Sequence, residues 1–341
     1  MKIKIGVFVA VLAFTATLGA MPRPAEASQI TLTYAFFAPS GTFPARQMEH
    51  WANEVNERTD GQVRVQTFPG GSLLGARDMY EGVRRGVADI GLSAPAYDPG
   101  RFPLSSGLTL PHGFPNATVA SLTYWDLMQE MQAKEFDNFR VIALFTSEPA
   151  YVQSRRAVNG LDDMRNLQLR ATGSGVPSLE ALGASPVGMP MPSVPEALQT
   201  GVIEGVATSR EVLRDFRLAE NVKYVTDYPI GVVTFAALMD ERRWERLPEN
   251  VQQVIDELGR EMALWTGQYH DQHTADSISW SQENYDLQVI SLSDEERATW
   301  DERLQSQIDD WRHEAAGNGL PSEQFLTRLQ QIRDEHAEEY Q

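Results

Sequence analysis

The segment EALQTGVIEGV, residues 196–206, decides the fold because it repeats an earlier segment, EGVRRGVADIG, residues 81–91. Both have an acidic residue first, an apolar residue two positions later and a glycine at the sixth position, Gly86 or Gly201. Each pattern predicts a helix that glycine closes and a short strand that follows at once. The two units lie 115 residues apart and indicate two lobes of like construction, although helix–glycine–strand turns are common in α/β proteins.

Strand and helix patterns alternate around these two units. ITLTYAFF (30–37) and QVRVQTF (62–68) alternate apolar and polar residues as strands do, and we expect the loop 38–46 and a helix over 47–59 between them. Ser193 and Glu196 predict a capping box at the start of the second helix. This order predicts an α/β fold in which helices flank mostly parallel sheets.

The length of 341 residues favours two lobes over a single core. After Asp240 the pattern becomes helical and amphipathic, apart from one further strand in LQVISLS. No segment has the composition of a disordered linker, which favours a hinge between the lobes. The expected division is lobe I over 28–148 with 236–275, lobe II over 149–235 with 276–315, and a C-terminal helical tail over 316–341.

Residues 1–27 are predicted to be a secretory signal peptide. Lys2 and Lys4 precede an apolar run, and AEA at 25–27 supplies the small residues of a cleavage site before Ser28. A membrane anchor is the alternative, but the apolar run is short for a span. We therefore expect a periplasmic mature chain that does not insert into the membrane.

Composition excludes several classes of function. The chain has no cysteine, which excludes disulfides, thiol catalysis and Cys-bound zinc. The formal charge of −18 makes nucleic acid and anionic lipid poor partners, so an anion site must be built locally from a few donors. The sequence has no phosphate loop, dinucleotide fingerprint or nucleophile elbow, and we expect no cofactor. His270 and His273, with Asp271 beside them, have a spacing that suits a metal, but we favour a solvated helix face and no metal site.

Arg170 stands where a strand meets a loop of small residues, in NLQLRATGSG (166–175). In α/β sheets, ligands bind in the crevice outside the carboxyl ends of the strands. Arginine binds a planar anion through two parallel hydrogen bonds, so this position suits an anion site. From spacing alone, a surface arginine paired with a neighbouring acid is an equally good interpretation.

Four segments together resemble the DctP-type periplasmic solute-binding proteins of TRAP transporters. They are FPGGSLLGARDMYEGVRRGVADIG (68–91), LDDMRNLQLRATG (161–173), LGASPVGMPMPSVPEALQTGVIEG (182–205) and the W..LPENVQQVID pattern (244–256). The resemblance implies a two-lobed periplasmic-binding-protein-like fold with a long helix bracing both lobes and C-terminal helices. It also implies a receptor rather than an enzyme, with a small organic acid as ligand and membrane permease subunits as partners.

The resemblance also implies the ligand-binding residues. Arg170 matches the family's carboxylate-binding arginine. Thr208 stands where many relatives have asparagine, Phe37 replaces a common polar residue, and Met191 takes a position that is often aromatic. The full set that we expect at the ligand is Arg170, Thr208, Phe37, Tyr97, Met191, Glu148, Ala94 and Phe235.

These departures predict a pocket less polar than one for dicarboxylates. We therefore expect a monocarboxylate with an apolar or aromatic body. Three alternatives stay open. Glu148 would suit the cationic end of a zwitterionic, amino-acid-like ligand, and a periplasmic enzyme on the same scaffold would use Glu148 as its acid or base. The third alternative is a receptor of a different importer class that shares the two-lobed plan.

Overall fold

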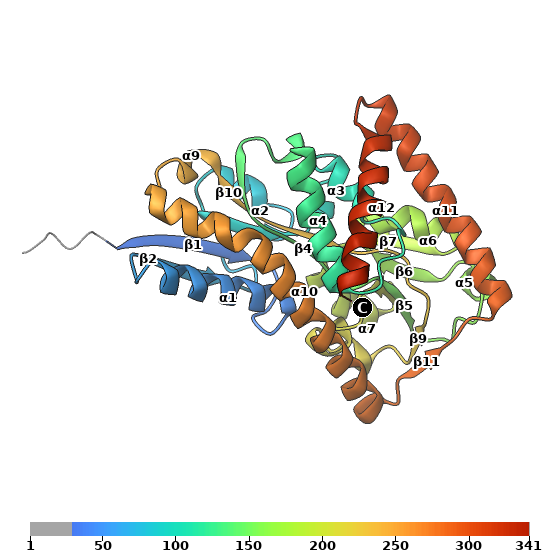
Figure 1. Cartoon of the computed structure of the whole chain (residues 1–341). Helices are drawn as coiled ribbons and strands as arrows, with labels where there is room; N and C mark the ends of the chain where they lie inside the picture. The colour runs from blue at the N-terminus through green and yellow to red at the C-terminus, as the bar shows by residue number, and fades with distance from the viewer. Residues whose placement is uncertain (1–28, 341) are drawn as a thin grey trace, which may run out of the picture.

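The computed structural model describes residues 29–340, so the expected signal peptide lies outside the described residues (Figure 1). The strands are β1 (Ile30–Phe36), β2 (Val63–Phe68), β3 (Ile90–Ser93), β4 (Phe139–Thr146), β5 (Tyr151–Ser154), β6 (Gln168–Ala171), β7 (Ser185–Gly188), β8 (Gly205–Thr208), β9 (Tyr224–Thr226), β10 (Thr234–Asp240) and β11 (Gln288–Ile290). The helices are α1 (Phe43–Arg58), α2 (Met79–Arg84), α3 (Pro103–Leu108), α4 (Ala117–Met131), α5 (Leu161–Met164), α6 (Val176–Ala181), α7 (Val194–Thr200), α8 (Val212–Asp215), α9 (Glu241–Trp244), α10 (Glu249–Tyr285), α11 (Asp294–Gly317) and α12 (Ser322–Glu339). Within this part of the chain, no helix is long and apolar enough to cross a membrane.

The described strands form two sheets, one in each lobe. The first sheet has the order β2–β1–β3–β10–β4, and the second has the order β11–β9–β5–β8–β6–β7. In the first sheet β10 runs antiparallel to both of its neighbours, and in the second sheet β5 does the same. The other pairings are parallel. The prediction of two α/β lobes with mostly parallel sheets is confirmed.

The two reversed strands are the ones that the chain enters as it crosses between lobes. The parallel strands end at the edge that faces the other lobe, so a strand entered at that edge must run in the opposite direction. The crossing segments, residues 147–150 and 227–233, are hydrogen-bonded to each other: the amide of Ser147 donates to the carbonyl of Val233 (2.9 Å), and that of Ile230 donates to the carbonyl of Ala150 (2.9 Å). The lobes are therefore joined by a pair of neighbouring linkers.

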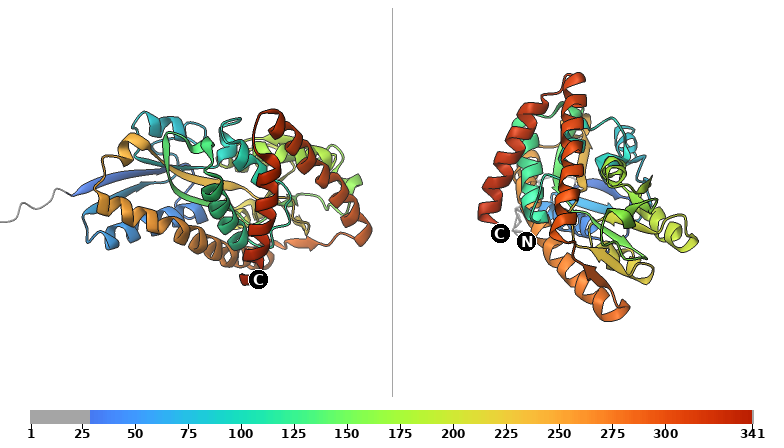
Figure 2. Two further views of the ribbon diagram at one scale, coloured as in Figure 1. Left: turned by 45° about the horizontal axis from the view of Figure 1, so that its top comes forward. Right: turned by 90° about the vertical axis from the view of Figure 1, so that its right-hand side faces the viewer.

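Helix α10 braces the two lobes over its 37 residues. It packs on α1 and α4 of the first lobe and on α8 of the second (Figure 1). Helices α11 and α12 form a helical hairpin in which α11 packs on α6 of the second lobe and α12 returns to α4 of the first (Figure 2). The expected lobe boundary at 275/276 lies inside α10, and the one at 235/236 lies inside β10.

The repeated units fold as their glycines predict. Gly86 and Gly201 both have a φ of 75°, a conformation that costs glycine little, and each stands between its helix and the strand β3 or β8. Two other local predictions are wrong. Helix α1 begins at Phe43 rather than at 47, with Pro44 in its first turn, where proline is well tolerated. Ser193 makes no side-chain cap, because a 3₁₀ turn gives it helical angles instead of the extended backbone of an N-cap.

Candidate ligand-binding site

A cavity lies between the lobes, where the carboxyl ends of the parallel strands meet. Counting the part that opens to solvent, it holds about 430 Å³ of space, toward the lower end of the range for small-molecule sites. The first lobe and the start of β10 supply Phe36, Phe37, Ala38, Thr42, Phe43, Pro44, Tyr97, Val233 and Phe235, and the second lobe supplies Arg170, Thr172, Met191, Thr208, Ser209, Glu211, Val212 and Phe216. The cavity therefore occupies the place where α/β proteins bind their ligands.

Arg170 is buried in the wall of this cavity, with 1 % of its surface exposed. Its strand β6 is hydrogen-bonded on both sides, to β7 and to β8, which fixes the backbone that carries the side chain. Nε donates to the carbonyl of Met189 (2.9 Å), and Nη2 donates to the hydroxyl of Tyr97 (3.0 Å). Among residues 29–340, no acidic side chain lies within ion-pair distance of the guanidinium. The structure thus rejects the interpretation of Arg170 as a surface arginine paired with an acid.

A guanidinium in this position has unused capacity for an anion. Arginine carries five N–H donors, and Arg170 directs two of them to protein acceptors. Removing a cation from water without a counter-ion is unfavourable, so the site is well suited to an anion that enters the cavity.

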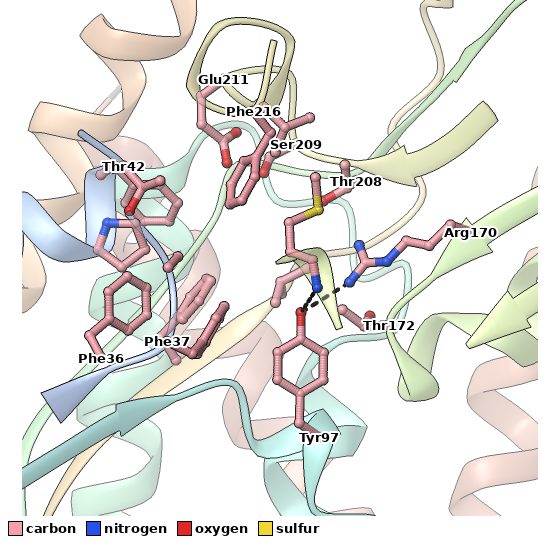
Figure 3. Close-up of a pocket in the computed structure, with 17 residues that line it drawn as sticks. Phe36, Phe37, Thr42, Tyr97, Arg170, Thr172, Thr208, Ser209, Glu211 and Phe216 are labelled. Carbon is pink, nitrogen blue, oxygen red and sulfur yellow. Dashed lines mark hydrogen bonds between the residues drawn. The ribbon is translucent and has the colours of Figure 1, made fainter. Parts of the chain in front are cut away.

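Tyr97 links the two lobes at the edge of the cavity (Figure 3). It lies in the 3₁₀ turn Pro95–Tyr97, directly after β3 of the first lobe. Its hydroxyl accepts hydrogen bonds from Arg170 and from the amide of Met191 (3.1 Å), both in the second lobe. The same ring makes an edge contact with Phe37, with 5.5 Å between the ring centroids. Tyr97 therefore orients the Arg170 guanidinium and also forms hydrogen bonds that connect the two lobes.

The remaining wall is largely aromatic. Phe36 and Phe37 lie side by side at the end of β1, with ring centroids 4.6 Å apart. Phe43 meets Phe235 edge to face at 5.5 Å, and Phe216 lies across the cavity from Phe36 and Phe37 (Figure 3). These rings offer an apolar surface to the body of a ligand, while Thr208 adds a hydroxyl near the sheet edge.

Two of the residues expected at the ligand do not line the cavity. Ala94 is fully buried just before the Tyr97 turn. Glu148 lies in the first linker, and its carboxylate is bound by the backbone amide (2.7 Å), Nε (2.9 Å) and Nη2 (2.7 Å) of Arg210. The Arg210 guanidinium in turn lies over the ring of Tyr151 at 3.8 Å. Arg210 therefore binds the Glu148 carboxylate that we expected to face the ligand.

The His270–His273 segment is not the solvated helix face that we expected. His270 is fully buried and stacked on Phe43, with ring centroids 3.8 Å apart. Asp271 accepts hydrogen bonds from the first two amides of α4, and His273 is hydrogen-bonded to Asp215 (2.7 Å). The three side chains point to different partners, and no metal-binding group of three or more His, Cys, Asp or Glu occurs in residues 29–340.

The sequence interpretation missed several residues of the cavity wall, Glu211 above all. Glu211 comes three residues after the end of β8, in SREVLRD, where it has the appearance of an exposed acid at the start of a helix. The strand-end rule that places Arg170 at the cavity also places this segment there, but it does not single out Ser209 and Glu211 as ligand-binding residues. Thr42 lies in the segment 38–46, which the sequence predicts to be a loop and does not mark as part of the site.

Comparison with known proteins identifies the chain. Residues 34–314 match the model of the DctP family, described as bacterial extracellular solute-binding protein, family 7. A TRAP periplasmic solute-binding protein from Desulfovibrio salexigens, crystallised as an open complex with the C-terminus of a symmetry mate in its ligand-binding site, is 43 % identical. The match covers 90 % of this chain and 96 % of that one, with a TM-score of 0.81.

Two further relatives differ in the ligands they bind. A TRAP solute-binding protein from an unidentified marine microbe, specific for aromatic acids and crystallised with 3-hydroxybenzoate, is 26 % identical; the match covers 90 % of this chain and 98 % of that one, with a TM-score of 0.86. The C4-dicarboxylate-binding protein DctB of Bacillus subtilis is 23 % identical over 81 % of this chain and 80 % of its own length. These relatives are solute-binding proteins and not enzymes. The chain therefore belongs to the DctP family of bacterial extracellular solute-binding proteins, the solute receptors of TRAP transporters.

Proposed function

We propose that the chain is a periplasmic receptor that binds a small organic acid between its lobes through Arg170 and delivers it to the membrane permease subunits of a TRAP transporter. The observation that carries this proposal is the buried Arg170 guanidinium, which faces the cavity and has no acidic partner in the described protein. A ligand carboxylate supplies the missing negative charge and accepts parallel hydrogen bonds from the planar guanidinium. Export through the signal at residues 1–27 belongs to the same proposal.

We further propose that the ligand is a monocarboxylate with an apolar or aromatic body. Arg170 is the only basic residue in the cavity wall of the described chain, so a second carboxylate on the ligand would have no cation to bind. The phenylalanine rings in the cavity wall suit an apolar ligand body. Burying that body is favourable by about 25 cal/mol per Å² of apolar surface removed from water. The marine relative that binds aromatic acids supports this class of ligand.

A thermal-shift screen tests the ligand class. Benzoates and medium-chain fatty acids are expected to raise the melting temperature, because a ligand at 100 times its Kd adds about 2.7 kcal/mol to the free energy of unfolding. Succinate, malate and fumarate serve as matched C4-dicarboxylates and are expected to have no effect. Stabilisation by the C4-dicarboxylates alone would contradict the proposal.

Tyr97→Phe is expected to weaken binding about tenfold to a hundredfold, mainly through faster dissociation. The substitution removes the acceptor of two hydrogen bonds. The bond from the charged Arg170 contributes about 1.5–3 kcal/mol, and the bond from the Met191 amide about 0.5–1.5 kcal/mol. Because both bonds cross between lobes, their loss favours the open state. Stopped-flow fluorescence would measure the rates, with Tyr224→Phe on strand β9, away from the cavity, as the control. Equal dissociation rates in the two variants would rule out Tyr97 as an interlobe contact that retains the ligand.

A further inference from the structure

Glu211 is a second polar group in the cavity, and the role of Arg170 does not account for it. It precedes α8 in the second lobe and is 4 % exposed. In Figure 3 its carboxyl group lies at the upper edge of the cavity, apart from Arg170 at the right. One of its oxygens, Oε2, is buried and has no hydrogen-bond partner in the described protein. Buried polar atoms are rarely left without a partner, so this one requires an explanation.

His270 lies next to Glu211 and is also buried with unsatisfied hydrogen-bonding atoms. It comes from α10, is fully buried, and neither ring nitrogen has a hydrogen-bond partner among the described residues. Its Nε2 lies 3.7 Å from Oε2 of Glu211, which is too long for a hydrogen bond. Its ring stacks on Phe43, itself part of the cavity wall. The imidazole therefore supports the wall and limits where the Glu211 carboxyl can lie.

The surroundings of Glu211 favour an uncharged pair. The charged and titratable groups around it are Asp215, Glu148, Arg210, His270 and His273. Burial, together with the nearby carboxylates of Asp215 and Glu148, raises the pKa of Glu211 well above its ordinary value. Burial also lowers the pKa of His270 well below its ordinary value. Both shifts favour a protonated carboxylic acid beside a neutral imidazole.

A neutral carboxylic acid can both donate and accept a hydrogen bond. A hydroxyl group has the same two capacities, so it can bind Glu211 without moving a proton on or off the protein. An ammonium group would instead require Glu211 to lose its proton. We propose that Glu211, positioned by His270, determines specificity by binding a hydroxyl group of the ligand at a point away from the carboxylate; this inference rests on the proposed binding of that carboxylate by Arg170.

The test compares acids that differ by one hydroxyl, on two Glu211 variants. The probes are benzoate against 3-hydroxybenzoate and hexanoate against 6-hydroxyhexanoate, measured by calorimetry on the full mature chain. On the wild type, the hydroxyl is expected to raise affinity at least tenfold in one pair. In Glu211→Met this advantage is expected to disappear, so that the two members of each pair bind with equal affinity, and in Glu211→Gln, which keeps a neutral donor and acceptor, it is expected to survive. If the Met variant does not fold, Glu211→Ala removes the same carboxyl without adding bulk.

Each contrary outcome has a distinct meaning. An unchanged hydroxyl advantage in Glu211→Met, or no advantage on the wild type, would overturn the inference and leave the role of Arg170 standing. Tighter binding of 3-(aminomethyl)benzoate than of 3-hydroxybenzoate, with proton release seen as a buffer-dependent enthalpy, would overturn it in favour of an ionised Glu211. If none of the acids binds the wild type, the proposed function fails, and the inference fails with it. Arg170→Met separates the two roles, because it should weaken both members of a pair by the same factor.

Discussion

Arg170→Met is expected to weaken ligand binding by about 30-fold to several thousandfold. Truncating one partner of a buried, hydrogen-bonded charge contact costs about 2–5 kcal/mol, and each 1.4 kcal/mol changes affinity tenfold. Methionine fills much of the space of the arginine side chain but offers no donor to a carboxylate. Isothermal calorimetry with the acid that stabilises the wild type most strongly would measure the loss.

The same substitution is expected to make the ligand-free protein more stable. The guanidinium is 1 % exposed and has no acidic partner among residues 29–340, so the folded chain bears the cost of removing a cation from water. That cost outweighs the hydrogen bonds to Met189 and Tyr97 that methionine gives up. A gain in stability together with a loss of affinity is typical of residues kept for binding.

Arg165→Met is the matched control for this experiment. Arg165 lies five residues earlier, is largely exposed and pairs with Asp162 on the surface. Exposed pairs contribute little, so this change should alter neither affinity nor melting temperature appreciably. If Arg170→Met bound the acid as tightly as the wild type does, Arg170 could not be the carboxylate-binding residue.

The sequence predicts those parts of the fold and site that depend on local pattern. The glycines at 86 and 201 predict their turns because only a left-handed backbone closes a helix in this way. Arg170 is placed correctly at the cavity because strand ends in an α/β sheet share one edge. Its role as the carboxylate-binding residue stays a prediction.

Parts of the site that depend on which distant segments meet could not be predicted in this way. Glu148 and Glu211 are both acids in loops beside strands, and their sequences give no reason to distinguish them. In the structure, Arg210 binds the carboxylate of Glu148, whereas Glu211 is buried near α10 with one carboxyl oxygen, Oε2, left without a hydrogen-bond partner among the described residues. That difference is set by the position of α10, which comes from the far end of the chain.

Helix α10 also shows why its own polar face was misinterpreted. Its buried residues include polar side chains spaced three or four residues apart, namely Thr266, His270, Thr274, Ser277 and Ser281, and all of these except His270 are small. A hydrophobic pattern marks a buried helix face only when the face is apolar. Here the helix lies close to other backbone, and small side chains allow that approach whether or not they are polar. The small size of most side chains on this face is what allows it to be buried, and the spacing of hydrophobic residues in the sequence does not reveal it.

Gly267→Ala tests this account and is expected to reduce the free energy of unfolding by about 2–4 kcal/mol. A methyl group on Gly267 would lie 2.5 Å from the Cα of Thr118, 2.9 Å from its amide nitrogen and 3.0 Å from the carbonyl oxygen of Ala117. These are backbone atoms at the start of α4, so no side chain can rotate out of the way. Forcing extra atoms into such a contact typically costs about 1–3 kcal/mol, and more where the neighbours are rigid.

The loss of stability in Gly267→Ala has a second source, one helical turn further along α10. Asp271 holds the amides of Ala117 (2.7 Å) and Thr118 (3.1 Å), so any movement that relieves the new methyl group stretches these bonds at the start of α4. Gly317→Ala is the control, since that glycine ends helix α11 with no atom near its added methyl, and alanine there should add up to about 1 kcal/mol. Urea unfolding of both variants would give the two free energies. Equal stabilities would mean that α10 can shift freely against α4, and the helix could not then act as the rigid brace against which the two lobes close.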